Sequence, residues 1–133
     1  MNLSSMDFED IEKRAQDIVE KLSGGKGDGQ GYSSFVRNLY DIVRKINYTG
    51  NASIVKAKIL LLYHISRKMD KKGKEEKKTL EELRKVLIGA CNEMIEAGDE
   101  KKEEIFNKLK IFLQALIAGM KYKEVMNTMS RGR

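Results

Sequence analysis

"NASIVKAKILLLYHISRKMDKKGKEEKK" (Asn51–Lys78) combines an apolar, core-type segment with cations along its whole length. It holds four consecutive large apolar residues, Ile59–Leu62, within a pattern that repeats with the period of a helix. A helix this apolar has to be covered by other helices, so the segment predicts a packed helical protein. Its lysines and arginines either keep a buried helix soluble or face a polyanion, and this choice decides which function is inferred.

The chain of 133 residues suits a single domain and is long enough to bury a core. No segment reaches the roughly 18 apolar residues of a membrane span, and the acidic start "MNLSSMDFED" lacks the layout of a secretory signal. One cysteine excludes an intramolecular disulfide and is typical of a reducing compartment. We therefore expect a cytoplasmic protein that does not associate with membranes.

Charge is distributed unevenly along the chain. The formal net charge is +6, but the first 22 residues contain six acids and three bases, so the remainder carries about +9. A basic body of this kind favours an anionic partner such as nucleic acid, although many helical proteins are basic for solubility alone. Composition leaves both interpretations open.

Apolar residues follow a helical period almost throughout, and no segment alternates with period two for long enough to predict a strand. The sequence predicts an all-α, compact bundle of about five helices in a single domain, 1–133. We expect a first helix over 1–22, a flexible glycine-rich linker over 23–31, a main bundle over 32–123 and a frayed tail over 124–133. The expected capping residues are Ser4 or Ser5, Ser33 or Ser34, Asn51, and Thr79 in a capping box with Glu82.

Two segments interrupt the helical pattern. "SGGKGDGQG" (Ser23–Gly31) lacks the Gly-Lys-Ser/Thr of a phosphate-binding loop and follows a helix rather than a strand, so it is interpreted as a linker. Because a linker of this length tethers it loosely, the first helix can pack on its own body or on another copy. "DKKGKEEKK" (Asp70–Lys78) is a charge run around a glycine, and we expect it to be either a mobile cationic arm or a solvated loop.

The sequence contains no recognisable set of catalytic or metal-binding residues. His64 is the only histidine and Cys91 the only cysteine, so neither belongs to a pair of zinc ligands. Cys91 falls on the apolar face of its helix, and the acidic pairs Glu81/Glu82 and Glu103/Glu104 lie among lysines. We expect no enzymatic activity, no metal and no cofactor.

Cations and tyrosines alternate on the sides of two successive helices that face away from the expected core. At about 100° per residue, one arc of the second helix contains Arg37, Tyr40, Arg44 and Tyr48. The third helix repeats the arrangement with Lys56, Tyr63 and Arg67, with His64 at the margin. Cations that neutralise phosphates beside rings that stack on bases are typical of single-strand binding. Alternatively, the tyrosines border the core and the cations are solvated surface charge, and spacing does not distinguish the two.

Three segments resemble a known family: "SSFVRNLYDIVRKI" (Ser33–Ile46), "KAKILLLYHISRK" (Lys56–Lys68) and "FNKLKIFLQALIAGMKYK" (Phe106–Lys123). They are similar to the small helical subunit of type III-A (Csm-type) CRISPR effector complexes, and the resemblance covers about residues 33–123. The glycine-rich linker and the Asp70–Lys78 run depart from the family pattern.

The resemblance implies a bundle of about five helices that supports guide and target RNA along the inner filament of an antiviral ribonucleoprotein complex, without chemistry of its own. The RNA-binding residues that it implies are Arg37, Arg44, Lys56, Arg67 and Lys121. The aromatic or polar side chains that could also face RNA are Tyr40, Tyr63 and His64. The implied partners are RNA, other subunits of the effector complex and copies of the chain itself. Independently of the resemblance, the tethered first helix and the surplus of apolar positions on the third and fifth helices predict a homodimer in isolation.

Two other functions stay open. One is a protein–protein scaffold without direct nucleic-acid contact, whose basic face meets an acidic partner. The other is a helical DNA-binding regulator, because the short turn "NYTGN" (Asn47–Asn51) joins the second and third helices. Against the regulator, a recognition helix presents polar base-reading side chains, whereas the third helix is apolar over most of its circumference.

Overall fold

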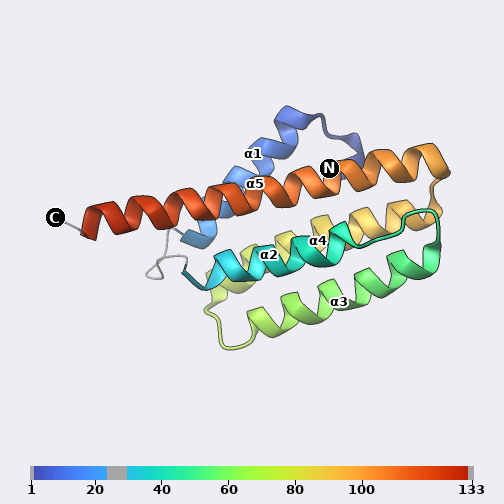
Figure 1. Cartoon of the computed structure of the whole chain (residues 1–133). Helices are drawn as coiled ribbons and strands as arrows, with labels where there is room; N and C mark the ends of the chain where they lie inside the picture. The colour runs from blue at the N-terminus through green and yellow to red at the C-terminus, as the bar shows by residue number, and fades with distance from the viewer. Residues whose placement is uncertain (1, 24–29, 132–133) are drawn as a thin grey trace.

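The computed structural model describes residues 2–23 and 30–131, and this part of the chain is all-α (Figure 1). A short 3-10 helix comes first and five α-helices follow. Their bounds are η1 Leu3–Ser5, α1 Phe8–Ser23, α2 Gln30–Arg44, α3 Asn51–Met69, α4 Lys74–Glu96 and α5 Asp99–Arg131. The prediction of a compact, single-domain bundle of about five helices is confirmed.

Helices α2 to α5 form a ring in which each helix packs against its neighbours. α2 contacts α5 and α3, α3 contacts α4, and α4 contacts α5, while α1 packs across α5 and α4. In Figure 1, α2 lies between the long α5 above it and α3 below it. The outward side of α2 is therefore flanked by the edges of two other helices, and this arrangement positions the candidate site.

One cluster of buried apolar side chains fills the ring. Its largest fully buried members are Ile11, Ile18, Leu39, Ile54, Leu61, Ile65, Leu80, Leu83, Leu87, Met94, Ile105 and Phe112. Cys91 is also fully buried, and burial raises the pKa of its thiol to about 11, while the nearby ammonium of Lys58 acts in the opposite direction. The thiol therefore stays protonated near neutral pH and behaves as a small apolar side chain, not as a nucleophile.

The start of α1 differs from the prediction. α1 begins at Phe8, and Asp7 Oδ1 accepts the backbone N–H of Asp10 at 2.8 Å, as a capping side chain does. Neither Ser4 nor Ser5 caps this helix, because both lie in η1, and the hydroxyl of Ser4 donates to a side chain of α4.

The start of α4 also differs from the prediction. α4 begins at Lys74, so Thr79 lies inside the helix, where its hydroxyl donates to the carbonyl of Glu75 at 3.2 Å instead of forming a capping box. The charge run Asp70–Lys78 was expected to be a loop, but its second half is helical. Lysine and glutamate are strong helix formers, and acids in the first turn favour the helix dipole, which explains the earlier start.

Three further boundaries are corrected. α2 begins at Gln30, before Ser33 and Ser34, so these serines do not cap it. Gly50 precedes α3, and the side chain of Asn51 donates to the carbonyl of Ile95 at the end of α4 rather than capping α3. α5 continues to Arg131, so the expected fraying after 123 is wrong for this segment. Of the predicted linker, residues 24–29 lie outside the described part of the chain.

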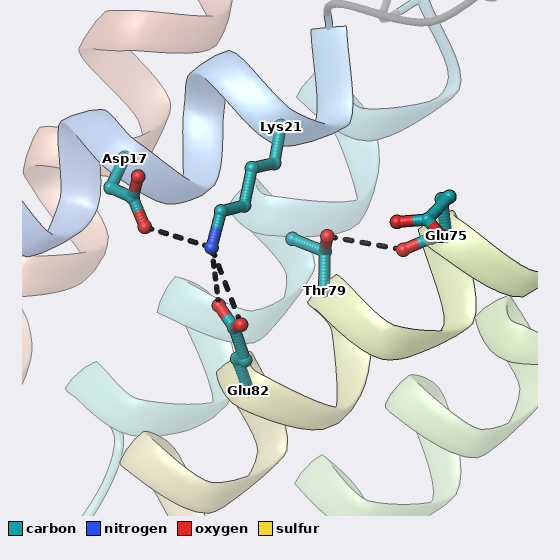
Figure 2. Close-up of polar contacts among 5 residues, drawn as sticks. All are labelled: Asp17, Lys21, Glu75, Thr79 and Glu82. Carbon is teal, nitrogen blue, oxygen red and sulfur yellow. Dashed lines mark hydrogen bonds and ion pairs between the residues drawn. The ribbon is translucent and has the colours of Figure 1, made fainter.

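The first helix packs on the body of its own chain. Lys21 of α1 lies between the carboxylates of Asp17, at 3.2 Å, and Glu82 of α4, at 3.3 Å, and these two acids raise its pKa (Figure 2). Lys123 of α5 pairs with Glu20 of α1 at 2.8 Å. In this structure α1 thus takes the first of the two packings that the loose tether left open, on the body of its own chain.

Candidate nucleic-acid interface

α2 runs antiparallel to the two helices beside it. Toward α5, Gln114 Nε2 donates to the Tyr40 hydroxyl at 3.1 Å, and the ring centroids of Tyr48 and Phe106 are 5.2 Å apart. Toward α3, residues of both helices line a shared groove of about 340 Å³. These contacts bring cationic positions from three helices to one side of the molecule.

We define the α2 face as the outward side of α2 with the adjoining edges of α3 and α5. Its cations are Arg37 and Arg44 on α2, Lys45 directly after α2, Lys56 and Arg67 on α3, and Lys110 and Lys121 on α5. All of them are exposed except Lys110, which is half-buried. Gln114 contacts α2, and it marks the edge of α5 that faces this helix. Lys110 lies four residues before Gln114 and Lys121 seven residues after it, about one and two helical turns away, so both lie on the same edge. Lys56 and Arg67 are about three helical turns apart, so they lie on one side of α3.

Only part of the charge on the α2 face is neutralised internally. Arg44 Nε lies 2.9 Å from Asp41 Oδ1, and both side chains are 53% exposed. An exposed pair of this kind contributes little stability and can exchange partners. The face cations that form no ion pair within the described part of the chain are Arg37, Lys45, Lys56, Arg67, Lys110 and Lys121.

The predicted cations of α3 border two separate hollows. Lys56 lines the α2–α3 groove together with Asp41 and Lys45, over a floor that includes Ile42 and Leu60. Arg67 lines a second, shallower hollow of about 560 Å³ near the end of α3, with Tyr63, Asp70 and Lys77 among its other lining residues. A nucleic-acid strand that contacts both Lys56 and Arg67 would have to pass along the outer edge of α3.

The predicted aromatic residues differ in exposure. Tyr40 is half-buried, packs against the core and accepts the hydrogen bond from Gln114, so its ring is not available for stacking. Tyr63 is 56% exposed and lies edge-on to the half-buried His64, with ring centroids 5.4 Å apart. Of the three side chains, Tyr63 is the one that could stack on a base.

The sequence did not identify Lys45 and Lys110 as members of the α2 face. Lys45 was assigned no role because it falls outside the arc of Arg37 and Arg44, and it reaches the face through the groove shared with α3. The place of Lys110 depends on the register between α5 and α2, which no spacing within one helix reveals. Its ammonium lies 4.5 Å from the centroid of the Phe106 ring.

The outer side of α3 is apolar, as the apolar residues around most of the circumference of this helix indicated. Five large apolar side chains on it are between 39% and 62% exposed: Val55, Ile59, Leu60, Leu62 and Tyr63. A signal was present, because at about 100° per residue four consecutive residues such as Ile59–Leu62 cannot all face one core. Leu61 points inward and is fully buried, and its neighbours are left outside.

Over residues 2–23 and 30–131, no three His, Cys, Asp or Glu side chains come close enough together to hold a metal ion. None of the helices described is both long and apolar enough to cross a membrane. Comparisons of the chain with protein-family models, curated proteins and solved structures found no match. Function is therefore inferred from the α2 face and from the outer side of α3.

Proposed function

We propose that this chain is a non-catalytic RNA-binding protein and, as the resemblance of its sequence implies, the small subunit of a type III-A CRISPR interference complex. On this proposal, the α2 face contacts the phosphates of guide and target RNA, and Tyr63 borders the path of the strand. Phosphate contacts bind without regard to sequence, which suits a complex whose specificity comes from base pairing with a guide.

The observation that carries the proposal is the concentration of cations from three helices on one side of the bundle. Separate helices contribute Arg37, Lys56 and Lys121, and each is exposed and forms no ion pair within the described residues. Helices α2, α3 and α5 hold these side chains on a rigid framework, so binding requires no folding of the protein. Attraction between exposed charges is screened by salt, so affinity is expected to fall steeply as salt is added.

Changing Arg37→Glu, Lys56→Glu and Lys121→Glu together is expected to weaken binding to single-stranded RNA at least about tenfold at low salt. Each phosphate neutralised in a single strand contributes about 0.7 to the slope of log K against log salt, so losing three contacts should make that slope shallower by about two. Fluorescence anisotropy with labelled poly-U at several salt concentrations measures both quantities.

A matched control is Lys13→Glu, Lys74→Glu and Lys78→Glu, which changes the net charge equally. These exposed lysines lie on α1 and α4, and none of them lines the hollows that Lys56 and Arg67 border. The control should keep most of the affinity, and circular dichroism should show the same helicity for both variants. Equal losses in the two variants would show that overall charge, and not the α2 face, holds the RNA.

The apolar outer side of α3 favours a second candidate function, a protein–protein scaffold. A row of exposed aliphatic side chains offers nothing to phosphates, but it is typical of surfaces that another protein covers. Ile59 is 62% exposed and Leu62 is 41% exposed, and neither borders the cations of α2. The two functions are compatible if α3 contacts a neighbouring subunit while the α2 face contacts RNA.

We expect Ile59→Lys with Leu62→Lys to abolish incorporation into the effector complex when the chain is co-expressed with the subunits encoded by neighbouring genes. The isolated variant should keep its helicity and its affinity for poly-U, because neither side chain packs in the core or lies on the α2 face. Co-purification measured by mass spectrometry tests this. Normal incorporation of the variant would eliminate the outer side of α3 as a subunit contact.

A further inference from the structure

A polar cleft of about 260 Å³ lies between η1, α1 and α4. Charged and polar residues from all three elements line it, namely Asn2, Arg14, Lys85 and Glu93. Gly89 and the apolar residues Leu3, Val86 and Ala90 complete the lining. None of these residues belongs to the α2 face, so neither RNA binding nor subunit contact through α3 accounts for the cleft.

Two polar atoms at this cleft are buried and have no hydrogen-bond partner: Arg14 Nε, a donor, and Glu93 Oε1, an acceptor. Their charged groups do not pair with each other, and Lys85 forms no ion pair within the described residues either. A buried polar group without a partner loses its hydrogen bonds to water and gains none in return, so leaving it unpaired is costly. A donor and an acceptor left unpaired in one cleft indicate that an occupant supplies their partners.

Gly89 keeps the cleft open. It lies in the interior of α4, where glycine is less favourable than alanine because it loses more backbone entropy on folding. A Cβ atom at this position would meet no atom within 4 Å, so close packing of helices does not require glycine here. The missing side chain instead leaves free space within the lining.

The wall opposite Gly89 is held in place by contacts to two helices. The hydroxyl of Ser4 donates to Glu93 Oε2, and Lys108 Nζ donates to the carbonyl oxygen of Ser4 at 3.0 Å. Leu3 is buried beside them, at 2% exposure. One carboxylate oxygen of Glu93 is thus occupied by the protein, and the other is buried without a partner.

We propose that this cleft binds a protonated phosphate group, either free phosphate or a small phosphate monoester. The anionic oxygens meet Arg14 and Lys85, and the P–OH group donates to Glu93 Oε1 after the carboxylate turns this buried oxygen toward the cleft. Two cations and one carboxylate in the lining leave one positive charge, which matches a singly charged phosphate. An arginine fork suits an oxyanion of this geometry.

The carboxylate of Glu93 makes the site selective for an oxyanion that carries a proton. Sulfate has the same shape but no proton near neutral pH, so its oxygens would face Glu93 with no hydrogen between them. Glu93 Oε1 would then face a sulfate oxygen, and two acceptors without a hydrogen between them repel each other. This repulsion disfavours the binding of sulfate. Selectivity for phosphate over sulfate is therefore the signature of the proposed site.

Isothermal titration calorimetry of the full chain at pH 6.5 with inorganic phosphate, sulfate and ribose 5-phosphate tests the proposal. Phosphate should bind at least about tenfold more tightly than sulfate. Arg14→Gln should weaken phosphate binding by a similar factor. Glu93→Gln should abolish the selectivity, because the amide can donate to sulfate. Ribose 5-phosphate distinguishes a site for free phosphate, which excludes the ester, from a site for monoesters, which admits it.

Gly89→Leu provides a variant that fills the cleft without threatening the fold, because leucine favours helix and meets open space. It should abolish phosphate binding, whereas Lys74→Gln, elsewhere on α4, should leave it unchanged. Three results would each overturn the proposal: no binding by the unmodified chain, equal binding of sulfate and phosphate, or undiminished binding by Gly89→Leu. The charge-reversal variant of the α2 face should still bind phosphate, so the two proposals fail independently.

Discussion

Replacing Lys102 with methionine is expected to lower the free energy of unfolding by about 2–3 kcal/mol. Lys102 is only 6% exposed, and its ammonium donates to Asn51 Oδ1 at 2.9 Å and to the carbonyl oxygens of Met94 and Ile95 at the end of α4. A cation at a helix C-terminus is favoured by the helix dipole, and here it is the charged donor to two carbonyls of the last turn, whose other donors are the Ala97 N–H and the Asn51 side chain. Methionine fills a similar volume but donates no hydrogen bond. Urea unfolding followed by circular dichroism measures the loss.

The neighbouring lysine provides the control for this prediction. Lys101 is exposed and pairs with Glu104 at 3.3 Å on the same helix. Lys101→Met should change the free energy of unfolding by no more than about 0.5 kcal/mol, since exposed pairs contribute little. If Asn51→Ala is combined with Lys102→Met, the losses should not add, because both variants remove the same hydrogen bond. Equal losses for Lys101→Met and Lys102→Met would contradict the capping role of Lys102.

Alanine is expected to have opposite effects at two glycines, separating the free energies of unfolding of the variants by about 2–3 kcal/mol. At Gly119 of α5, a Cβ atom would lie 2.8 Å from Val19 Cγ2 of α1, so α1 would have to move away. Valine is stiff at χ1 and cannot rotate to make room. At Gly89 of α4, nothing lies within 4 Å, so alanine there should gain up to about 1 kcal/mol from helix propensity alone.

A third variant separates the steric effect from other causes. Val19→Ala removes the methyl groups that the new Cβ would meet, so Gly119→Ala in that background should no longer destabilise the bundle. Denaturant unfolding of the four chains forms a double-mutant cycle with a coupling of about 1–2 kcal/mol. A loss at Gly119 that persists without the Val19 methyl groups would show that close packing of α1 on α5 is not its cause.

Helix boundaries show where local sequence signals fail. Thr79 and Glu82 have the spacing of a capping box, yet α4 begins at Lys74, because the preceding lysines and glutamates continue the helix. Asn51 is a good capping residue in isolation, but its side chain contacts Lys102 and Ile95. In both cases a side chain that could cap a helix has another partner, and only the three-dimensional structure reveals that partner.

The candidate site was partly predictable. The outward positions of Arg37, Lys56 and Arg67 follow from the helical period, and the structure leaves all three exposed. Tyr40 falls on the same arc of its helix as Arg37, but it lies at the boundary with α5, where its hydroxyl accepts a hydrogen bond from Gln114. The period gives the direction of a side chain around its own helix axis, but it does not show which neighbouring helix covers that direction.

The helical period of the apolar residues is enough to predict a helical bundle and the core-facing side of each helix, because this periodicity is a local property of each segment. Three features appear only once the helices are packed: α2 lies between α3 and α5, Lys102 is buried at the end of α4, and Arg14 and Glu93 line one cleft. These juxtapositions depend on the order and register in which helices pack. Many side chains far apart in the chain set that register together, and no spacing within one helix encodes it.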